Sequence, residues 1–538
     1  MARKLTGAMV LLASLLWSAQ RLKGSDPNLK PEFHTSDRCF ACHNELTTAN
    51  GHDISIGLAW RASIMANSAR DPYWQASVRR ETIDHPKADS EIQDECSICH
   101  MPVMRYEAKL QGKKGEIFKQ LPFDADNKQS AAAEDGVTCT ICHQISKQKL
   151  GSRESFVGQF VIESPEAKNK RPEYGPFEVP PERQHIMDTS TGGFQPVQAQ
   201  HIRDSALCGS CHQLYTTARG PNGEAAGYLP EQMPYLEWLH SDYPSRYSCQ
   251  ACHMPEVHEA VNISSVLGVP RSGMHQHVFV GGNFLMQQIL NRYRDELDVA
   301  ALPGELTTAA DETLNFLQTQ SARLELSNVT VSAGRVQARV TVHNLTGHKL
   351  PTAYPSRRAW LHFSVQDRNG KTIFESGALK PDGSIVGNDN DADPSLFEPH
   401  YREISEAGQV QIYESILKDQ QEHVTTGLLA AIGYFKDNRM LPIGFDKNTA
   451  ERDIEVVGDA REDPQFTAGQ DTVSYSVPVS DSDGPFHIIV ELLYQPIGFR
   501  WAHNLEGYKA AEPQRFVGYY DSMSSAATTV LARAEANR

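Results

Sequence analysis

The pattern of hydrophobic and polar positions divides the 538-residue chain into two regions of different character. Before about residue 302, short helical patterns such as residues 72–81 alternate with loops rich in proline and glycine, such as residues 171–181. Helical periodicity continues at residues 284–299 and 314–321. Alternation typical of strands then follows at residues 323–329, 337–343, 359–366, 472–479 and 486–494. The pattern predicts an α+β chain, in which a mainly helical and irregular domain precedes a β-sandwich-like domain.

Length and pattern together give the expected domain boundaries. A chain of this size exceeds what one hydrophobic core usually accommodates, so at least two domains are expected. The first 24 residues are set apart as a targeting segment. The remaining boundaries are a first domain at residues 25–300, a helical linker at 301–321 and a C-terminal β-rich domain at 322–538.

All ten cysteines of the chain fall into five Cys-x-x-Cys-His motifs. In each motif, two thiols one helical turn apart can form thioethers with the two vinyl groups of a haem, and the histidine that follows can bind the iron. A disulfide needs no such histidine, and five repeats that use every cysteine argue against zinc. The sequence therefore predicts five c-type haems, attached and ligated proximally at Cys39, Cys42 and His43; Cys96, Cys99 and His100; Cys139, Cys142 and His143; Cys208, Cys211 and His212; and Cys249, Cys252 and His253.

The N-terminus has the features of a secretory signal. Arg3 and Lys4 precede an apolar stretch at residues 5–19, which is too short for a comfortable span of a hydrocarbon core about 30 Å thick. Trp17 stands where a small residue is preferred near a cleavage site, so an uncleaved anchor is the alternative. We expect export to the periplasm or the cell exterior, with membrane contact only if this segment is retained.

Charge narrows the range of partners. The formal net charge is -16, with 40% hydrophobic and 22% charged residues, as in a folded, water-soluble protein. An acidic chain does not favour nucleic acid, which binds basic surfaces. The acidity either serves solubility or steers the protein toward a basic redox partner.

The residue on the second axial position of each iron separates an electron carrier from an enzyme, because only an open iron can bind substrate. We expect the distal ligands among histidines beside a motif or a glycine turn, with methionine as an alternative near the first haems. The candidates are His201, His185, His240, His277 with His275 as its rival, His348, His85 and Met65.

One acidic loop has the composition of a cation site. Asp389, Asp391 and Asp393 alternate along the chain and are compatible with calcium, although the glycine and the closing glutamate of an EF-hand are absent. An ordinary acidic loop is the alternative.

Several segments resemble the cytochrome c-554-like multihaem c-type cytochromes. The likeness extends beyond the haem motifs to residues 65–74 (MANSARDPYW), 94–102 (DECSICHMP), 174–177 (YGPF), 207–213 (LCGSCHQ) and 346–352 (TGHKLPT). This resemblance implies a carrier with mainly bis-histidine haems, distal ligands at His185 and His201, and a segment at residues 347–351 that reaches a haem. The fifth motif and the long second domain depart from the namesake tetrahaem carriers.

Two classes of function follow. In the first, the protein transfers electrons along five haems between periplasmic or membrane redox partners. In the second, one haem has an open position and the protein is an oxidoreductase for a small nitrogen or sulfur compound. The number of good distal candidates favours electron transfer over catalysis and leaves the second class open.

Overall fold

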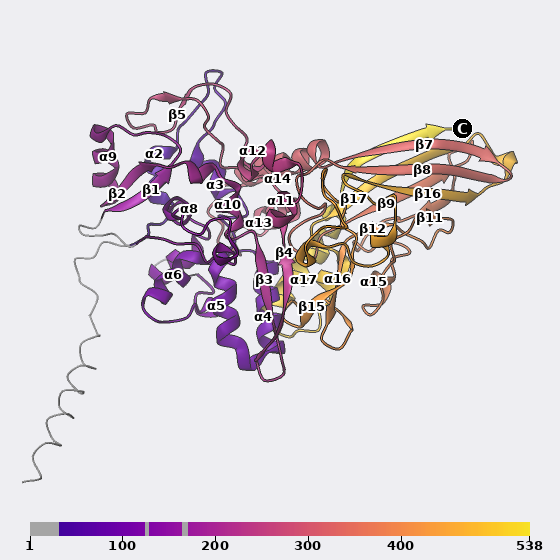
Figure 1. The fold of residues 1–538 in the computed structure, drawn as a ribbon, viewed down its shortest axis with the longest axis horizontal. Coiled ribbons are helices and arrows are strands. Elements are labelled where there is room, and N and C mark those ends of the chain that lie inside the picture. The colour runs from indigo at the N-terminus through magenta and orange to yellow at the C-terminus, as the bar shows by residue number, and fades with distance from the viewer. Residues whose placement is uncertain (1–31, 124–127, 164–169) are drawn as a thin grey trace, which may run out of the picture.

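The computed structural model describes residues 32–123, 128–163 and 170–538. Figure 1 shows two regions along the longest axis of the molecule: a compact group of short helices and loops, and an elongated β region that ends at the C-terminus. The expected targeting segment at residues 1–24 lies outside the described residues. Within the described ranges, no helix combines the length and apolar character needed to cross a bilayer.

The first region contains mostly short helices joined by irregular segments. Its helices are α2 (Asp37–His43), α3 (Ile56–Arg61), α4 (Pro72–Asp84), α5 (Asp89–His100), α6 (Pro102–Leu110), α7 (Lys128–Glu134), α8 (Cys139–Gln144), α9 (Pro181–Thr191), α10 (Ser205–Gly209), α11 (Pro234–Leu239), α12 (Cys249–His253) and α13 (Phe284–Arg292). Its strands form three two-stranded sheets: β1 (Arg171–Gly175) with β2 (Phe194–Gln198), β3 (Leu214–Arg219) with β4 (Ala225–Gln232), and β5 (Val261–Asn262) with β6 (Pro270–Arg271).

The Cys-x-x-Cys-His motifs lie on or at the ends of short helices. Four motifs are contained in α2, α5, α8 and α12, and the fourth along the chain begins in α10. A helical turn brings the two thiols of a motif to one side of the backbone, because residues three apart are neighbours on a helix. This local geometry is what attachment to the two vinyl groups of one haem requires.

Helix α14 (Pro303–Gln320) leads into the second region, which has two main sheets. One sheet has the order β10 (Thr372–Ser376), β9 (Arg358–Gln366), β17 (His487–Gln495), β18 (Thr529–Asn537), with β12 (Ile412–Tyr413) also paired to β9. The other has the order β11 (Glu403–Ile404), β16 (Gln470–Pro478), β8 (Arg335–Asn344), β7 (Ala322–Ser332). A smaller sheet contains β14 (Val424–Thr425), β13 (Ser415–Asp419) and β15 (Ala431–Asp437), and the remaining helices are α15 (Asp389–Ala392), α16 (Phe499–His503) and α17 (Ala511–Met523).

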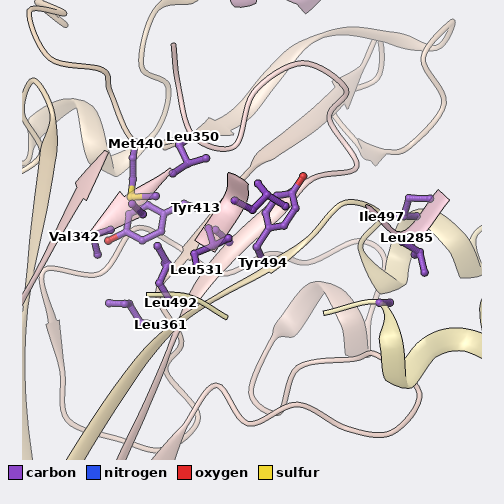
Figure 2. Close-up of a cluster of buried hydrophobic side chains, with 14 of the residues drawn as sticks. Leu285, Val342, Leu350, Leu361, Tyr413, Met440, Leu492, Tyr494, Ile497 and Leu531 are labelled. Carbon is purple, nitrogen blue, oxygen red and sulfur yellow. The ribbon is translucent and has the colours of Figure 1, made fainter. Parts of the chain in front are cut away.

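The two main sheets share a hydrophobic core. Phe363 of β9 stacks on Tyr475 of β16, with ring centroids 3.9 Å apart, and both side chains are fully buried. Figure 2 shows Ile497 beside Leu285 of α13, and both side chains belong to the same buried cluster as the sheet residues. The core of the β region therefore extends into the first region.

Helix α17 fastens the two regions together from the other side. It packs along α4, where Phe516 contacts Tyr73 with ring centroids 4.8 Å apart. Glu512 pairs with Arg79 at 2.8 Å. These contacts join residues more than 400 positions apart in the sequence.

The predicted strands coincide with β7, β8, β9, β16 and β17, and the helix predicted at residues 72–81 is α4. Two predictions need correction. The helix expected at 284–299 ends at Arg292, and the loop expected at 171–181 begins with strand β1. β1 pairs with β2 through backbone hydrogen bonds, a constraint that a Pro-rich sequence does not reveal.

Candidate haem-binding site

A single large cavity runs through the first region and reaches the β region. Its volume is about 1210 Å³, and its walls include all ten cysteines and the five motif histidines. No disulfide joins any two of these ten cysteines. The motifs, which span more than 200 residues of sequence, therefore meet around one space.

The motif histidines are oriented by backbone carbonyls. The Nδ1 atoms of His43, His143 and His253 each lie 2.6 Å from a carbonyl oxygen, those of Ile263, Tyr174 and Val280 respectively. His100 Nδ1 lies 3.0 Å from the Ser68 oxygen. A carbonyl can only accept, so each Nδ1 donates and each Nε2 keeps its lone pair free, as metal-binding histidines require.

Burial keeps these imidazoles neutral. Removal from water lowers the pKa of His43, His143 and His253, and it lowers the pKa of His100 and His212 to about 4. Neutral imidazole is the form that binds a metal ion, so the motif histidines are ready to do so at neutral pH.

Two of the motif histidines face a second imidazole. The ring centroids of His143 and His277 are 6.4 Å apart, and those of His253 and His348 are 6.3 Å apart, with interplanar angles of 19° and 14°. Metal–nitrogen bonds of about 2 Å on both sides of one ion would place ring centroids about 6 Å apart. The second imidazoles are also neutral, since burial lowers the pKa of His277 to about 3 and of His348 to about 4.

An unpaired cation in the same cavity also fits haem. Arg357 lines the wall near His253 and His348, and its Nη1 donates to the Thr352 carbonyl at 3.1 Å. Among the residues the structure describes, no carboxylate forms an ion pair with it. A partly buried guanidinium without an acidic partner suits a haem propionate. The thiols, the free Nε2 atoms and this cation together fit c-type haem.

The structure places the distal candidates differently. His277, His348 and Met65 line the cavity, as does His275, whose Nδ1 lies 2.5 Å from the Met254 oxygen. The wall does not include His201, His185, His240 or His85.

Each of those four histidines has other surroundings. His201 Nε2 lies 2.8 Å from the Ile145 oxygen, and His240 Nε2 lies 3.2 Å from the Asp446 oxygen. His85 Nε2 is 3.8 Å from Glu81, and His185 is exposed on α9. Their ligand roles remain expectations from the sequence that this geometry does not favour.

Thiols of different motifs are neighbours in space. Cys39 contacts Cys139, Cys99 contacts Cys211, and Cys208 contacts Cys249. Cys142 also lies close enough to Cys211 for their charges to interact. The first motif is thus joined to the third, the third to the fourth, and the fourth to both the second and the fifth.

A polar patch on the cavity wall near the second motif was not predicted from the sequence. Tyr73, Ser77 and Glu81 lie on one face of α4, and Glu231 and Tyr354 join them from β4 and the β region. Burial raises the pKa of Glu81 to about 7, although it accepts a hydrogen bond from the Leu428 amide at 2.8 Å. Residues from three separate segments form this patch, so only the fold brings it together.

The acidic loop at residues 389–393 has partners within the protein. Asp391 pairs with Arg358 at 2.7 Å and also accepts the Ile385 amide at 2.8 Å, and both charged side chains are nearly fully buried. Asp393 accepts the Ser395 amide and hydroxyl, and Asp389 begins helix α15. Because Arg358 already neutralises Asp391, this geometry gives calcium no support.

A second acidic group, His400 with Asp463 and Asp471, is fully buried, and its ligand atoms lie within 4.8 Å of one another. Amide groups of Gln411 and Asn438 donate to His400 Nδ1 at 2.8 and 3.1 Å, and each amide is fixed because its oxygen accepts a backbone N–H. His400 therefore carries its proton on Nε2, 3.3 Å from Asp463. The His400 ring therefore takes part in a hydrogen-bond network and has no free lone pair to offer a metal.

Comparison with known proteins bears on the fold. No protein-family model and no curated protein sequence matches the chain. Among solved structures, it is similar to a penta-haem cytochrome c552 from Thermochromatium tepidum, with a TM-score of 0.53 and 16% sequence identity. The match covers 95% of this chain and 100% of that chain. The chain therefore has the fold of a multihaem c-type cytochrome, with its five Cys-x-x-Cys-His motifs around one cavity.

Proposed function

We propose that the protein is an exported electron carrier that moves electrons along five covalently bound haems between redox partners. The observation that carries this proposal is the single cavity, in which all five motifs meet. Separate haem sites would serve separate reactions, whereas one shared space puts neighbouring haems within reach of one another.

The thiol contacts give the proposed order. Each motif fixes one edge of its haem, so touching thiols imply neighbouring haem edges. The contacts of Cys39 with Cys139, and of Cys208 with Cys249, support a path from the first motif through the third and fourth to the fifth. The contact of Cys99 with Cys211 adds the second motif as a branch at the fourth.

Bound haems would supply reversible one-electron exchange at iron. The protein's part is to hold the axial imidazoles still: the carbonyls of Ile263, Tyr174 and Val280 fix the ring orientation of three proximal histidines. His277 and His348 stand opposite His143 and His253, so they would fill the second axial positions there and exclude other ligands. These features favour carriage over catalysis at the third and fifth haems.

A second candidate function rests on the polar patch. Tyr73, Ser77 and Tyr354 place hydroxyl groups on the cavity wall near the second motif, and Glu81, whose pKa burial raises to about 7, adds a carboxyl group. Among the described histidines, none pairs with the His100 ring as His277 pairs with His143; Trp74 stacks on it at 4.4 Å. An open haem at this motif, with hydroxyl and carboxyl groups as proton donors, would suit reduction or oxidation of a small nitrogen or sulfur compound.

Electron paramagnetic resonance and magnetic circular dichroism of the oxidised holoprotein distinguish the two functions. We expect five haems per chain, all low-spin, if the protein is a carrier. If one haem is high-spin and binds nitrite, hydroxylamine or sulfite, the protein is an oxidoreductase and not only a carrier. Fewer than five haems per chain by mass spectrometry would contradict both.

Location and partners belong to the same proposal. The basic start and apolar stretch of the N-terminal segment support export, and the net charge of -16 favours a basic redox partner. We expect the rate of electron exchange with such a partner to fall as salt concentration rises, because screening weakens steering between opposite charges.

A further inference from the structure

One of the β-region segments that reach the cavity is the loop before β9. His348 lies between β8 and β9, and its ring stands opposite His253, 6.3 Å away between centroids. The loop rests on the haem region, where a Cβ atom added at Gly347 would lie 3.1 Å from the Tyr243 ring and 3.2 Å from the Trp238 ring. A side chain at this position would push the two aromatic rings back by a few tenths of an ångström, so glycine lets the loop lie close to this surface.

Beneath this loop lies a group of four buried charges. Lys349 is next to His348 in the sequence, and its Nζ donates to Asp437 at 2.7 Å. Asp437 also accepts two hydrogen bonds from Arg439, at 2.7 and 2.8 Å. Arg439 reaches across to Glu237 of the haem region at 3.1 Å. Lys349 and Glu237 are both fully buried.

Glu237 also holds the backbone that carries the histidine. Its Oε2 accepts the Lys349 amide at 3.1 Å and the Thr352 hydroxyl at 2.5 Å. The Lys349 carbonyl in turn accepts His348 Nδ1 at 2.9 Å. One carboxylate of the first region therefore holds the backbone of Lys349, and the carbonyl of the same residue orients the imidazole from the second region.

The charges balance within the group. Two anions, Glu237 and Asp437, face two cations, Lys349 and Arg439, so the complete set is neutral. Removal of one member would leave an uncompensated charge in a region without water, which strongly favours a rearrangement of the loop. The Leu350 and Met440 backbones, which exchange two hydrogen bonds of 2.9 Å, transmit such a change along the loop.

We propose that Glu237, Lys349, Asp437 and Arg439 form a positioning network that holds His348 on the fifth haem, so that docking of the β region sets the coordination of that haem. The inference rests on the proposed function, in which His253 and His348 bind the same iron. These four residues position a ligand through another residue and do not touch the haem themselves.

The test compares full-length, haem-loaded variants by electron paramagnetic resonance in the oxidised state. His348→Ala should convert one low-spin haem to high-spin, and added imidazole should restore the low-spin signal. Glu237→Gln, which keeps the shape and removes the charge, should weaken the hold on His348 at that same haem. We expect the apparent affinity of the Glu237→Gln variant for cyanide at this haem to rise about tenfold, because a larger fraction of its molecules has an open position on the iron.

Two further variants keep the result decisive. Thr352→Val removes only one hydrogen bond to Glu237, so it folds even if Glu237→Gln does not, and it should give a smaller change of the same kind. Asp391→Asn breaks the buried pair with Arg358, in the same region but outside the network, and should leave all five haems unchanged.

The outcomes separate the two claims. If His348→Ala leaves every haem low-spin, the ligand assignment within the proposed function is wrong. If His348→Ala behaves as expected but Glu237→Gln and Thr352→Val bind cyanide like the unaltered protein, the network has no positioning role. The same holds if Asp391→Asn produces an equal change, because the effect would then be general destabilisation.

Discussion

The haem region and the β region differ in what fills their interiors. In the β region, large side chains such as Phe363, Tyr413 and Tyr475 are fully buried in one continuous cluster. In the haem region, a cavity of about 1210 Å³ separates several smaller clusters. The comparison shows that one region completes its core with its own side chains, whereas the other leaves space for apolar cofactors.

The two regions also differ in the pKa values of their buried carboxyl groups. Burial raises the pKa of Asp71 to about 6 and of Glu81 and Asp135 to about 7 in the haem region. Burial alone would also raise the pKa of Asp437 in the β region, but Arg439 and Lys349 hold it well below its usual value. At a pH between their usual and their raised pKa values, these three acids of the haem region are therefore protonated, whereas Asp437 of the β region stays ionised beside its two cations.

Preventing haem attachment should give the largest effect. We expect the full chain produced without haem to lose the fold of residues 32–300, because the cavity would collapse, while the β region keeps its own core. Limited proteolysis followed by mass spectrometry should show cuts in the haem region at least about 100-fold faster than in the holoprotein. Equal protection of both regions would contradict the comparison.

Glu81→Gln should give an intermediate effect that depends on pH. The pKa of Glu81 is raised from 4.5 to about 7 on folding, so ionisation of the unfolded chain lowers stability as pH rises between these values. The neutral amide removes this loss, which amounts to about 3 kcal/mol above pH 7. Unfolding in guanidinium at pH 5 and pH 8, followed by haem absorption, measures the free energy of unfolding of both proteins.

Asp437→Asn is the matched variant in the β region. Folding lowers the pKa of Asp437, so the stability that its ionised carboxylate contributes is present above the unfolded value of 3.8 and is lost only in strong acid. We expect Asp437→Asn to destabilise the protein by about 3–5 kcal/mol at neutral pH, since Lys349 and Arg439 lose their partner. An unchanged pH slope in Glu81→Gln, or a stabilised Asp437→Asn, would remove the contrast in buried charge.

Calcium should give the smallest effect. Asp391 is already paired with Arg358, and Asp393 accepts the Ser395 amide and hydroxyl, so residues 389–393 leave too few free carboxylates to gather around calcium. We expect millimolar calcium to change the melting temperature by less than about 1 °C. A calcium-dependent rise in the melting temperature that disappears in Asp393→Asn would contradict this expectation and support a cation site in the loop.

Some elements could be predicted from the sequence because their signals are local. The strands β7, β8, β9, β16 and β17 alternate with a period of two, since one face of each packs on the core. Strand β1 was missed because its Pro- and Gly-rich segment has no such period, and only pairing with β2 makes it a strand. Likewise, His201 has a persuasive sequence context, but its Nε2 lies against the Ile145 carbonyl.

The sequence by itself determined the haem-attachment motifs and the change from a haem-rich to a β-rich region. Both depend on neighbouring residues, since the two thiols and the histidine of a motif lie within five positions. Only the tertiary structure decided which motifs are neighbours, which carbonyls orient the imidazoles and how Glu237 reaches Lys349 from 112 positions away. Such contacts depend on chain topology and on packing between two regions, which no local pattern of residues encodes.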